Sequence, residues 1–203
     1  MNVRVGVLAV QGAFLAHAEV LSDLGVGAVE VRQPSHLEGL DAIVLPGGES
    51  STMSKLLVST GLWDPLEALL HDGLPVFGTC AGMILLGTSI LDGRADQSSF
   101  GLIDIAVRRN AYGRQVDSFE AEIDTAVGQF HGVFIRAPRI EAMGADVEVL
   151  GSHNDEAVIV RQGTALAAAF HPELSGDVRL HQFFLSHVAG LAPATIETMT
   201  KGL

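Results

Sequence analysis

The chain's only cysteine, Cys80, lies in the pattern G-x-C-x-G formed with Gly78 and Gly82. An apolar run precedes this pattern and another follows it, which predicts a tight turn from a strand into a helix. Such a turn holds its central side chain above the edge of a sheet, as in the nucleophile elbow known with serine. The first amides of the helix favour the thiolate, and the Ala81 amide lies where an oxyanion could form. The alternative is a buried cysteine without chemistry.

A thiolate nucleophile requires a nearby base, and the stretch AAAFHPELS at 167–175 offers one. His171 directly follows an apolar run that ends at Phe170, and Glu173 comes two residues later. Because neighbouring strands of a parallel sheet end at one edge, His171 and Cys80 can meet although they are far apart in the sequence. Glu173 can then orient the imidazole as the third member of a Cys-His-Glu triad. A His-Pro-Glu tripeptide alone is a weak signal, and only its combination with the Cys80 turn favours catalysis.

A third turn, LPGGESST at 45–52, also follows a predicted strand and precedes a helix. Gly47 and Gly48 allow the backbone to approach a ligand closely, and the helix that starts near Ser50 supplies further amide donors. The alternative is an ordinary turn with Ser50 as the helix N-cap. The stretch is not a nucleotide-binding P-loop, because the Gly-Lys-Ser/Thr ending is absent.

The other histidines do not have the spacing of metal ligands, because they form no H-x-x-x-H pair and have no cysteine partner. Glu120 and Glu122 alternate along a predicted strand, which indicates a solvated face rather than the carboxylate pair of a glycosidase. The sequence therefore predicts no metal site. We interpret most of the remaining histidines as surface or packed residues: His17, His36, His71, His131, His153, His181 and His187.

The formal net charge of −12 makes nucleic acid and anionic membranes poor partners. Clustered arginine on such an acidic chain can hold a small anion such as a carboxylate, although scattered surface charge is the alternative. A single cysteine cannot form an internal disulfide, and no stretch resembles a signal peptide or a bilayer-spanning helix, so we expect a soluble cytoplasmic protein. The clustered arginines lie between 108 and 139 and are Arg108, Arg109, Arg114, Arg136 and Arg139.

Predicted strands and helices alternate over residues 1–90. Strands are expected at 3–10, 28–32, 42–45 and 75–78, and helices at 13–24, from about 51, at 63–71 and at 81–88. This alternation predicts an α/β fold, a three-layer sandwich in which helices cover both faces of a mostly parallel sheet. A closing helix is expected at 174–190, and the absence of a linker predicts one domain over 1–203. Between them lie the short β-type runs GLIDIAVRR, FEAEI, GQFHGVFI, VEVLG, EAVIVRQ and TALAAAF.

Taken together, PGGES at 46–50, GTCAG at 78–82 and HPE at 171–173 resemble the triad-type (class I) glutamine amidotransferases. Four longer stretches narrow the resemblance to the glutaminase subunit of pyridoxal 5′-phosphate synthase, and it extends over essentially the whole chain. These stretches are AVQGAFLAH at 9–17, PGGESSTM at 46–53, RRNAYGRQVDSFEAE at 108–122 and FIRAP at 134–138.

The resemblance implies a flavodoxin-like fold and a complete reaction without a cofactor. Cys80 would attack the side-chain amide of L-glutamine to form a γ-glutamyl thioester. His171 would take the thiol proton and pass it to departing ammonia, Glu173 would orient His171, and water would release glutamate. The resemblance also implies a substrate site and an oxyanion site. Its residues would be Gly47, Gly48, Glu49, Arg109, Ile135 and Arg136 around glutamine, with the backbone amides of Gly48 and Ala81 at the oxyanion.

The resemblance further implies a partner, a separate (β/α)8-barrel synthase chain that would use the ammonia together with a pentose phosphate and a triose phosphate. Gln11 falls where the family contacts that chain, and activity without it is expected to be weak. Three alternatives stay open: a glutaminase that serves another acceptor, a sensor that kept the fold and uses Cys80 as a redox switch, and a cysteine hydrolase of esters or peptides.

Overall fold

A computed structural model describes residues 3–109 and 118–191, and its main feature is a nine-stranded sheet of order β2-β1-β3-β4-β12-β11-β10-β7-β8. The first five strands of this order run parallel. β3, β4 and β12 are buried along their whole length, as expected for apolar strands covered on both faces. The five strands are Gly27–Val31 (β2), Arg4–Leu8 (β1), Ala42–Leu45 (β3), Val76–Thr79 (β4) and Ala165–Ala168 (β12).

Antiparallel strands extend this sheet beyond β12, and three further strands form a small second sheet of order β5-β6-β9. The antiparallel strands are Glu156–Gln162 (β11), Glu148–His153 (β10), Phe119–Thr125 (β7) and Gly128–Phe134 (β8). The small sheet consists of Gly87–Ile90 (β5), Ile103–Arg108 (β6) and Arg139–Met143 (β9).

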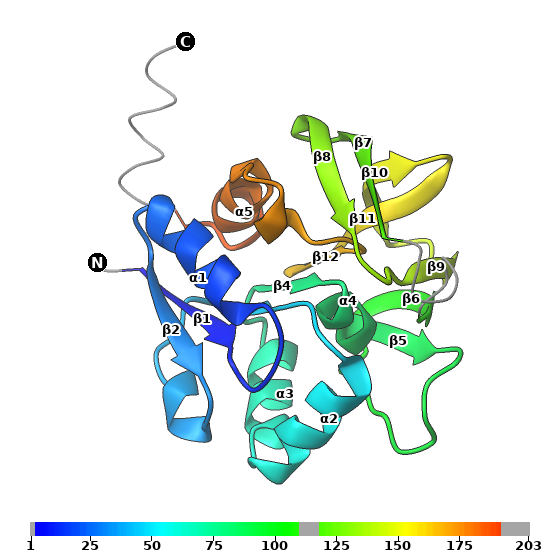
Figure 1. Cartoon of the computed structure of the whole chain (residues 1–203). Helices are drawn as coiled ribbons and strands as arrows, with labels where there is room; N and C mark the ends of the chain where they lie inside the picture. The colour runs from blue at the N-terminus through cyan, green and yellow to red at the C-terminus, as the bar shows by residue number, and fades with distance from the viewer. Residues whose placement is uncertain (1–2, 110–117, 192–203) are drawn as a thin grey trace.

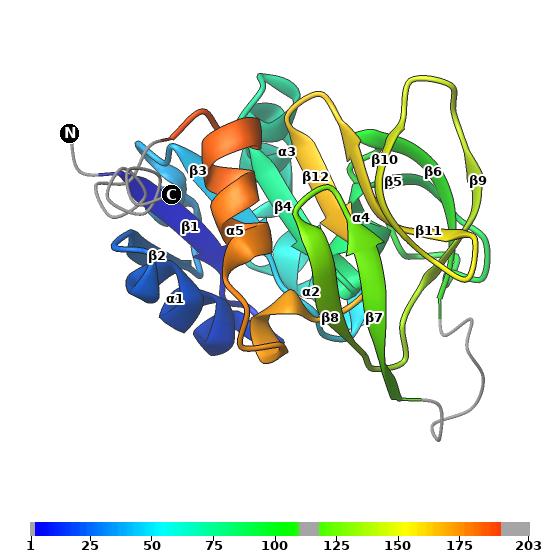
Figure 2. The ribbon, with the colours of Figure 1, turned by 90° about the horizontal axis from the view of Figure 1, so that it is seen from above.

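Helices cover both faces of the parallel strands, which confirms the predicted three-layer α/β fold (Figure 1). One face carries α1 (Phe14–Asp23) and α5 (Arg179–Phe183), and Figure 2 shows them side by side next to the β7–β8 hairpin. The other face carries α2 (Ser50–Ser59), α3 (Trp63–His71) and α4 (Ala81–Leu86). The short helices Pro34–Leu37 (η1), Pro172–Leu174 (η2) and Phe184–Val188 (η3, a π turn) complete the described elements.

The closing helix is shorter than predicted, since residues 175–178 are not helical and α5 begins only at Arg179. Gly176 has a positive φ of 73°, which interrupts a right-handed helix. The Asp177 side chain accepts the Arg179 amide at 2.9 Å, so this turn has its own hydrogen bonds. The prediction of one continuous helix over 174–190 is therefore wrong in its first part.

The helix expected at 81–88 ends at Leu86, and Gly87 begins β5 instead. β9, which the sequence did not predict, is exposed along most of its length and so has no apolar alternation to reveal it. It forms by pairing with β6, with Arg108 opposite Arg139. Both strands belong to the small sheet, which packs beside the parallel core.

The pairing of β4 with β12 has the largest consequence for chemistry. Thr79 lies opposite Ala168 in parallel register, so these two strands end side by side. The residues that follow them, Cys80 after β4 and His171 after β12, therefore emerge at one edge of the sheet.

Candidate active site

Cys80 occupies the turn between β4 and α4 in a strained backbone conformation, with φ 49° and ψ −101°. Its amide donates to the Ala168 carbonyl at 2.8 Å, which fixes the turn against β12. The turn requires small residues: a methyl group on Gly82 would overlap the Leu45 carbonyl, and one on Gly78 would lie 2.6 Å from the Gly82 backbone. Cys80 is thus held at the edge of the sheet as a nucleophile elbow would hold it.

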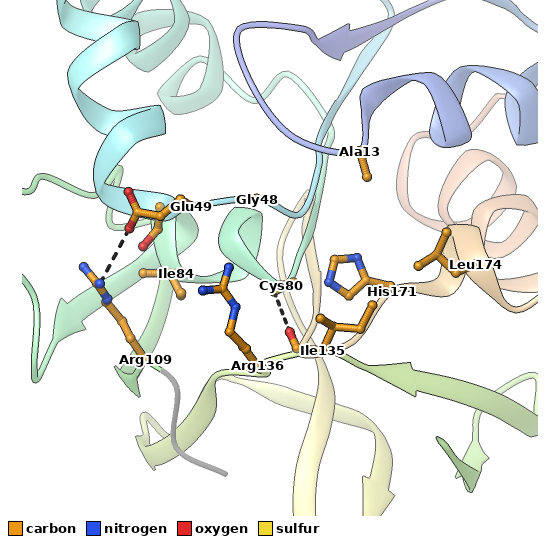
Figure 3. Close-up of a pocket in the computed structure, with 11 residues that line it drawn as sticks. Ala13, Gly48, Glu49, Cys80, Ile84, Arg109, Ile135, Arg136, His171 and Leu174 are labelled. Atoms are coloured by element: carbon orange, nitrogen blue, oxygen red, sulfur yellow. Dashed lines mark hydrogen bonds and ion pairs between the residues drawn. The ribbon is translucent and has the colours of Figure 1, made fainter. Parts of the chain in front are cut away.

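His171 and Glu173 lie beside Cys80. Nδ1 of His171 is 2.8 Å from Oε1 of Glu173, whose side chain is fully buried. Burial alone lowers the pKa of His171, but hydrogen bonding to Cys80 and Glu173 outweighs it and raises that pKa from 6.5 to about 10. The imidazolium form is therefore favoured at neutral pH when it faces the sulfur. Cys80 and His171 also line one cavity, where Figure 3 shows them as neighbours.

A buried pair of histidines lies behind Glu173. Its second carboxylate oxygen, Oε2, lies 3.3 Å from Nε2 of His17 on α1. Nδ1 of His17 is 2.9 Å from Nε2 of His181, and both rings are completely buried. The sequence predicts only that His17 and His181 are packed or surface residues. Their spacing in the sequence does not indicate that they meet behind Glu173.

The Gly47–Gly48 turn lies directly against His171, because a methyl group on Gly47 would overlap the imidazole ring. The Gly47 carbonyl accepts the Ala13 amide at 3.0 Å. Since a trans peptide points its C=O and N–H in opposite directions, this contact turns the Gly48 amide away from Ala13. Gln11, expected at a partner interface, is half-buried, and its Oε1 accepts the Glu49 amide at 3.0 Å. Gln11 therefore holds the turn in place.

Glu49, not Ser50, is the N-cap of α2. Its carboxylate accepts hydrogen bonds from the amides and hydroxyls of Ser51 and Thr52. Burial acts to raise the pKa of Glu49, but these four hydrogen bonds prevail and lower it to about 2. Glu49 thus presents a permanent negative charge beside the cavity.

The predicted arginine cluster divides into two groups. Nη1 of Arg109 is 2.6 Å from Gln97 Oε1, and its Nη2 is 3.6 Å from Glu49, so this guanidinium is held in place. Arg136 follows β8 with a φ of 46° and forms no ion pair within the described ranges 3–109 and 118–191. Arg108 and Arg139 form ion pairs with Glu141 and Glu156, away from the cavity. Arg114, together with the rest of 110–117 in the RRNAYGRQVDSFEAE stretch, lies outside the described residues.

These groups surround a cavity of about 310 Å³, at the small end of the range for ligand sites (Figure 3). Two guanidinium groups and one carboxylate border it, and the Ile135 carbonyl lies 3.9 Å from the Cys80 sulfur. Its size and charges suit an amino acid. The lining residues are Ala13, Gly48, Glu49, Ser50, Cys80, Ile84, Arg109, Ile135, Arg136, His171 and Leu174. Gly47, Ala81, Gln11 and Glu173 support this lining from behind.

In residues 3–109 and 118–191, no three histidine, cysteine or acidic side chains are grouped so that they could hold a metal ion. Over the same ranges, none of the helices combines the length and apolar character needed to cross a bilayer.

Comparison with known proteins relates the chain to one family. Residues 7–190 match the model of the SNO glutamine amidotransferase family. A protein of Mycobacteroides abscessus named pyridoxal 5′-phosphate synthase subunit PdxT is 56% identical over 190 residues, covering 93% of this chain and 98% of that protein. A protein of Acidothermus cellulolyticus with the same name is 53% identical over 197 residues, covering 93% and 95%. A crystal structure titled glutamine amidotransferase superposes with a TM-score of 0.87 at 49% identity, covering 92% of this chain and 99% of that one.

Proposed function

The chain belongs to the SNO glutamine amidotransferase family, and we propose that it hydrolyses L-glutamine to L-glutamate and ammonia as the glutaminase subunit of a pyridoxal 5′-phosphate synthase. The observation that carries this proposal is the convergence of Cys80, His171 and Glu173 at adjoining strand ends. The names of relatives that are more than half identical support the pathway. We further propose that residues 1–203 act as one domain in the cytoplasm.

The proposed reaction begins with the Cys80 thiolate and the His171 imidazolium. The sulfur attacks the side-chain carbonyl carbon of glutamine, and the carbonyl oxygen becomes an oxyanion near the backbone amides of Gly48 and Ala81. The C–N bond then breaks, and His171 supplies the proton with which ammonia leaves. A γ-glutamyl thioester remains on Cys80. Neutral His171 next deprotonates a water molecule, which attacks the thioester carbon, and the thiolate departs as glutamate is released.

Charges around the cavity support glutamine as the substrate. The guanidinium of Arg136 forms no ion pair with any described residue and borders the cavity, so we assign it the α-carboxylate. Arg109 is held by Gln97 and Glu49, so we assign the α-ammonium to the Glu49 carboxylate. Gly47 and Gly48 leave room for the His171 ring and the Gln11 side chain beside the turn, and the Ile135 carbonyl lies 3.9 Å from the sulfur.

Ammonia requires a protected route, because free ammonia is protonated in water and loses its nucleophilicity. We therefore propose that the chain works with a separate (β/α)8-barrel synthase that receives ammonia, with Gln11 at or near their contact. The test is glutamate release with and without that synthase chain. We expect weak release alone and clear stimulation by the partner, and full turnover without it would contradict the partner dependence.

The triad is tested by Cys80→Ala and His171→Ala. Each should reduce glutamate release to background while the thermal unfolding transition stays cooperative. His187→Ala is the matched control, because His187 is exposed and distant from the cavity. Retained turnover in either triad variant would refute the assignment.

A further inference from the structure

Three buried side chains extend the hydrogen-bonded group behind the proposed triad. His17 Nε2 lies 3.3 Å from Glu173 Oε2 and 3.1 Å from the hydroxyl of Thr79, the residue that precedes Cys80. On the other side of the ring, His17 Nδ1 lies 2.9 Å from Nε2 of His181. Thr79, His17 and His181 are all 0% exposed, so bulk water does not take part in these contacts.

The unpaired nitrogen of His181 determines which ring nitrogens of His181 and His17 carry a proton. No described residue provides a hydrogen-bond partner for His181 Nδ1. A buried unpaired N–H is rarer in proteins than a buried unpaired acceptor, so the proton of His181 belongs on Nε2. That N–H donates to His17 Nδ1, which must then be an acceptor. The proton of His17 therefore lies on Nε2, facing Glu173.

His17 faces Glu173, His171, His181 and Thr79, and it stays uncharged among them. Burial is the main reason that its pKa lies well below 6.5, and the nearby His181 and His171 lower it further. Burial also lowers the pKa of His181 to about 4. A charged His17 would compete with His171 for the Glu173 carboxylate, whereas a neutral N–H binds one oxygen and leaves the negative charge available to His171.

The contact between His17 and Glu173 is close but not fully aligned. The two atoms are 3.3 Å apart, yet Oε2 forms no hydrogen bond with any described residue. Thr79 explains this, because its hydroxyl oxygen is the nearer of two acceptors for the single Nε2–H. Oε2 is buried, so the nearby Nε2–H of His17 still acts on its negative charge at 3.3 Å.

We infer that His17 is a positioning residue for the proposed hydrolysis of glutamine. Its neutral Nε2–H lies 3.3 Å from one carboxylate oxygen of Glu173 and attracts it electrostatically, so that the other oxygen remains on Nδ1 of His171. His181 acts through His17 by fixing its tautomer. This inference rests on the proposed function, because it assigns His17 a role in the same reaction.

Two substitutions at position 17 separate positioning from packing. His17→Leu removes both nitrogens, and His17→Gln keeps an amide N–H near the position of Nε2. With the synthase present, we expect His17→Leu to lower kcat about 10- to 100-fold at unchanged KM, as when a group that orients a catalytic or metal-ligating side chain is lost. His17→Gln should restore most of this. The control is Leu21→Ala, a buried residue on the same helix, which should lower the thermal midpoint but leave kcat unchanged.

A pH profile gives a readout that a packing defect would not change. Labelling of Cys80 by a glutamine-like diazo-ketone requires the thiolate–imidazolium pair. Without His17, Glu173 is held less firmly and stabilises the imidazolium less, so the pKa of His171 should fall and the basic limb of labelling should move to lower pH in His17→Leu. It should stay in place in His17→Gln and Leu21→Ala. A kcat and basic limb in His17→Leu equal to those of the wild type would overturn the inference.

NMR of protein with ¹⁵N-labelled histidine tests the same idea without using activity. We expect His17 and His181 to appear as neutral Nε2–H tautomers that do not titrate between pH 5 and 8, with signals assigned from His17→Gln. An Nδ1–H tautomer for His17, or its titration in that range, would overturn the inference even if His17→Leu does not fold. Absence of glutaminase activity in the wild-type complex would instead refute the proposed function, whereas the NMR result depends only on the tautomer of His17.

Discussion

Gly47→Ala should inactivate the enzyme without unfolding it. A methyl group at this position would lie 2.8 Å from Nδ1 of His171 and closer still to Cε1, whereas ordinary contacts begin at 3.4 Å. Gly47 does not have a positive φ, so alanine fits the backbone and the conflict is with the imidazole alone. The ring cannot withdraw and keep its 2.8 Å hydrogen bond to Glu173 in the present geometry.

The size of the effect follows from the displacement. Clearing the methyl group requires the imidazole to move by about 1 Å, and a misplacement of that size costs about 100-fold in rate. We expect kcat for glutamate release in the presence of the synthase to fall by about this factor. The thermal midpoint should change little, because the turn is at the edge of the core.

Gly27→Ala is the matched control. Gly27 lies in β2, and a methyl group there would meet only the Val3 carbonyl, at 3.9 Å. The same glycine-to-alanine change should leave kcat unaltered. If Gly47→Ala kept more than half of the wild-type kcat, the close packing of Gly47 against a catalytic imidazole would be refuted.

Two further predictions concern charge. The pKa of His171 is raised from 6.5 to about 10, so its contribution to stability is present below pH 6.5 and lost as the pH rises toward 10. Cys80→Ala removes the sulfur partner, and the fall in thermal midpoint measured from pH 6 to 10.5 should therefore be smaller and end at lower pH than in the wild type; superimposable curves would contradict the pairing. Arg136→Ala should raise KM for glutamine about 10- to 100-fold with little change in kcat, because a charge-assisted hydrogen bond contributes about 1.5–3 kcal/mol. Arg139→Ala, which removes an ion pair with Glu156 away from the cavity, should leave KM unchanged, and equal effects of the two would refute the assignment of Arg136.

The sequence predicted well those elements that local pattern determines. The strand at 42–45 was predicted with its observed bounds, because an apolar run ends abruptly at Pro46-Gly47-Gly48. The helix at 63–71 was also predicted with its observed bounds. The closing helix was predicted too long because the run 174–190 has helical composition, whereas the positive φ of Gly176 is seen only in the structure. β9 was missed because pairing with β6, and not an apolar pattern, makes it a strand.

Contacts between distant segments were also hard to predict at the site. Cys80 and His171 were predicted to meet because parallel strands end at one edge, and that rule holds for any pair of neighbouring parallel strands. The rule does not say which helix covers the edge. The sequence indicates only that His17 is a packed or surface residue, whereas the structure places it, buried, against Glu173. The contact of Gln11 with a partner stays a prediction, and the structure adds that Gln11 accepts the Glu49 amide. Contacts of this kind depend on how α1 lies across the sheet, and a single sequence does not encode that placement in a readable pattern.

The position of α1 also gives the proposed partner dependence a physical route. Gln11 and Ala13, just before this helix, hold the Glu49 amide and the Gly47 carbonyl, and His17, on its first turns, contacts Glu173. One short segment is therefore bonded both to the turn that carries the proposed oxyanion amide and to the carboxylate that orients the base. A synthase chain bound at Gln11 would act on the turn through hydrogen bonds of about 3 Å, and on Glu173 through its 3.3 Å contact with His17, without entering the cavity. Such a partner shifts the glutaminase toward its active form only as far as it binds one arrangement of this segment more tightly than the other.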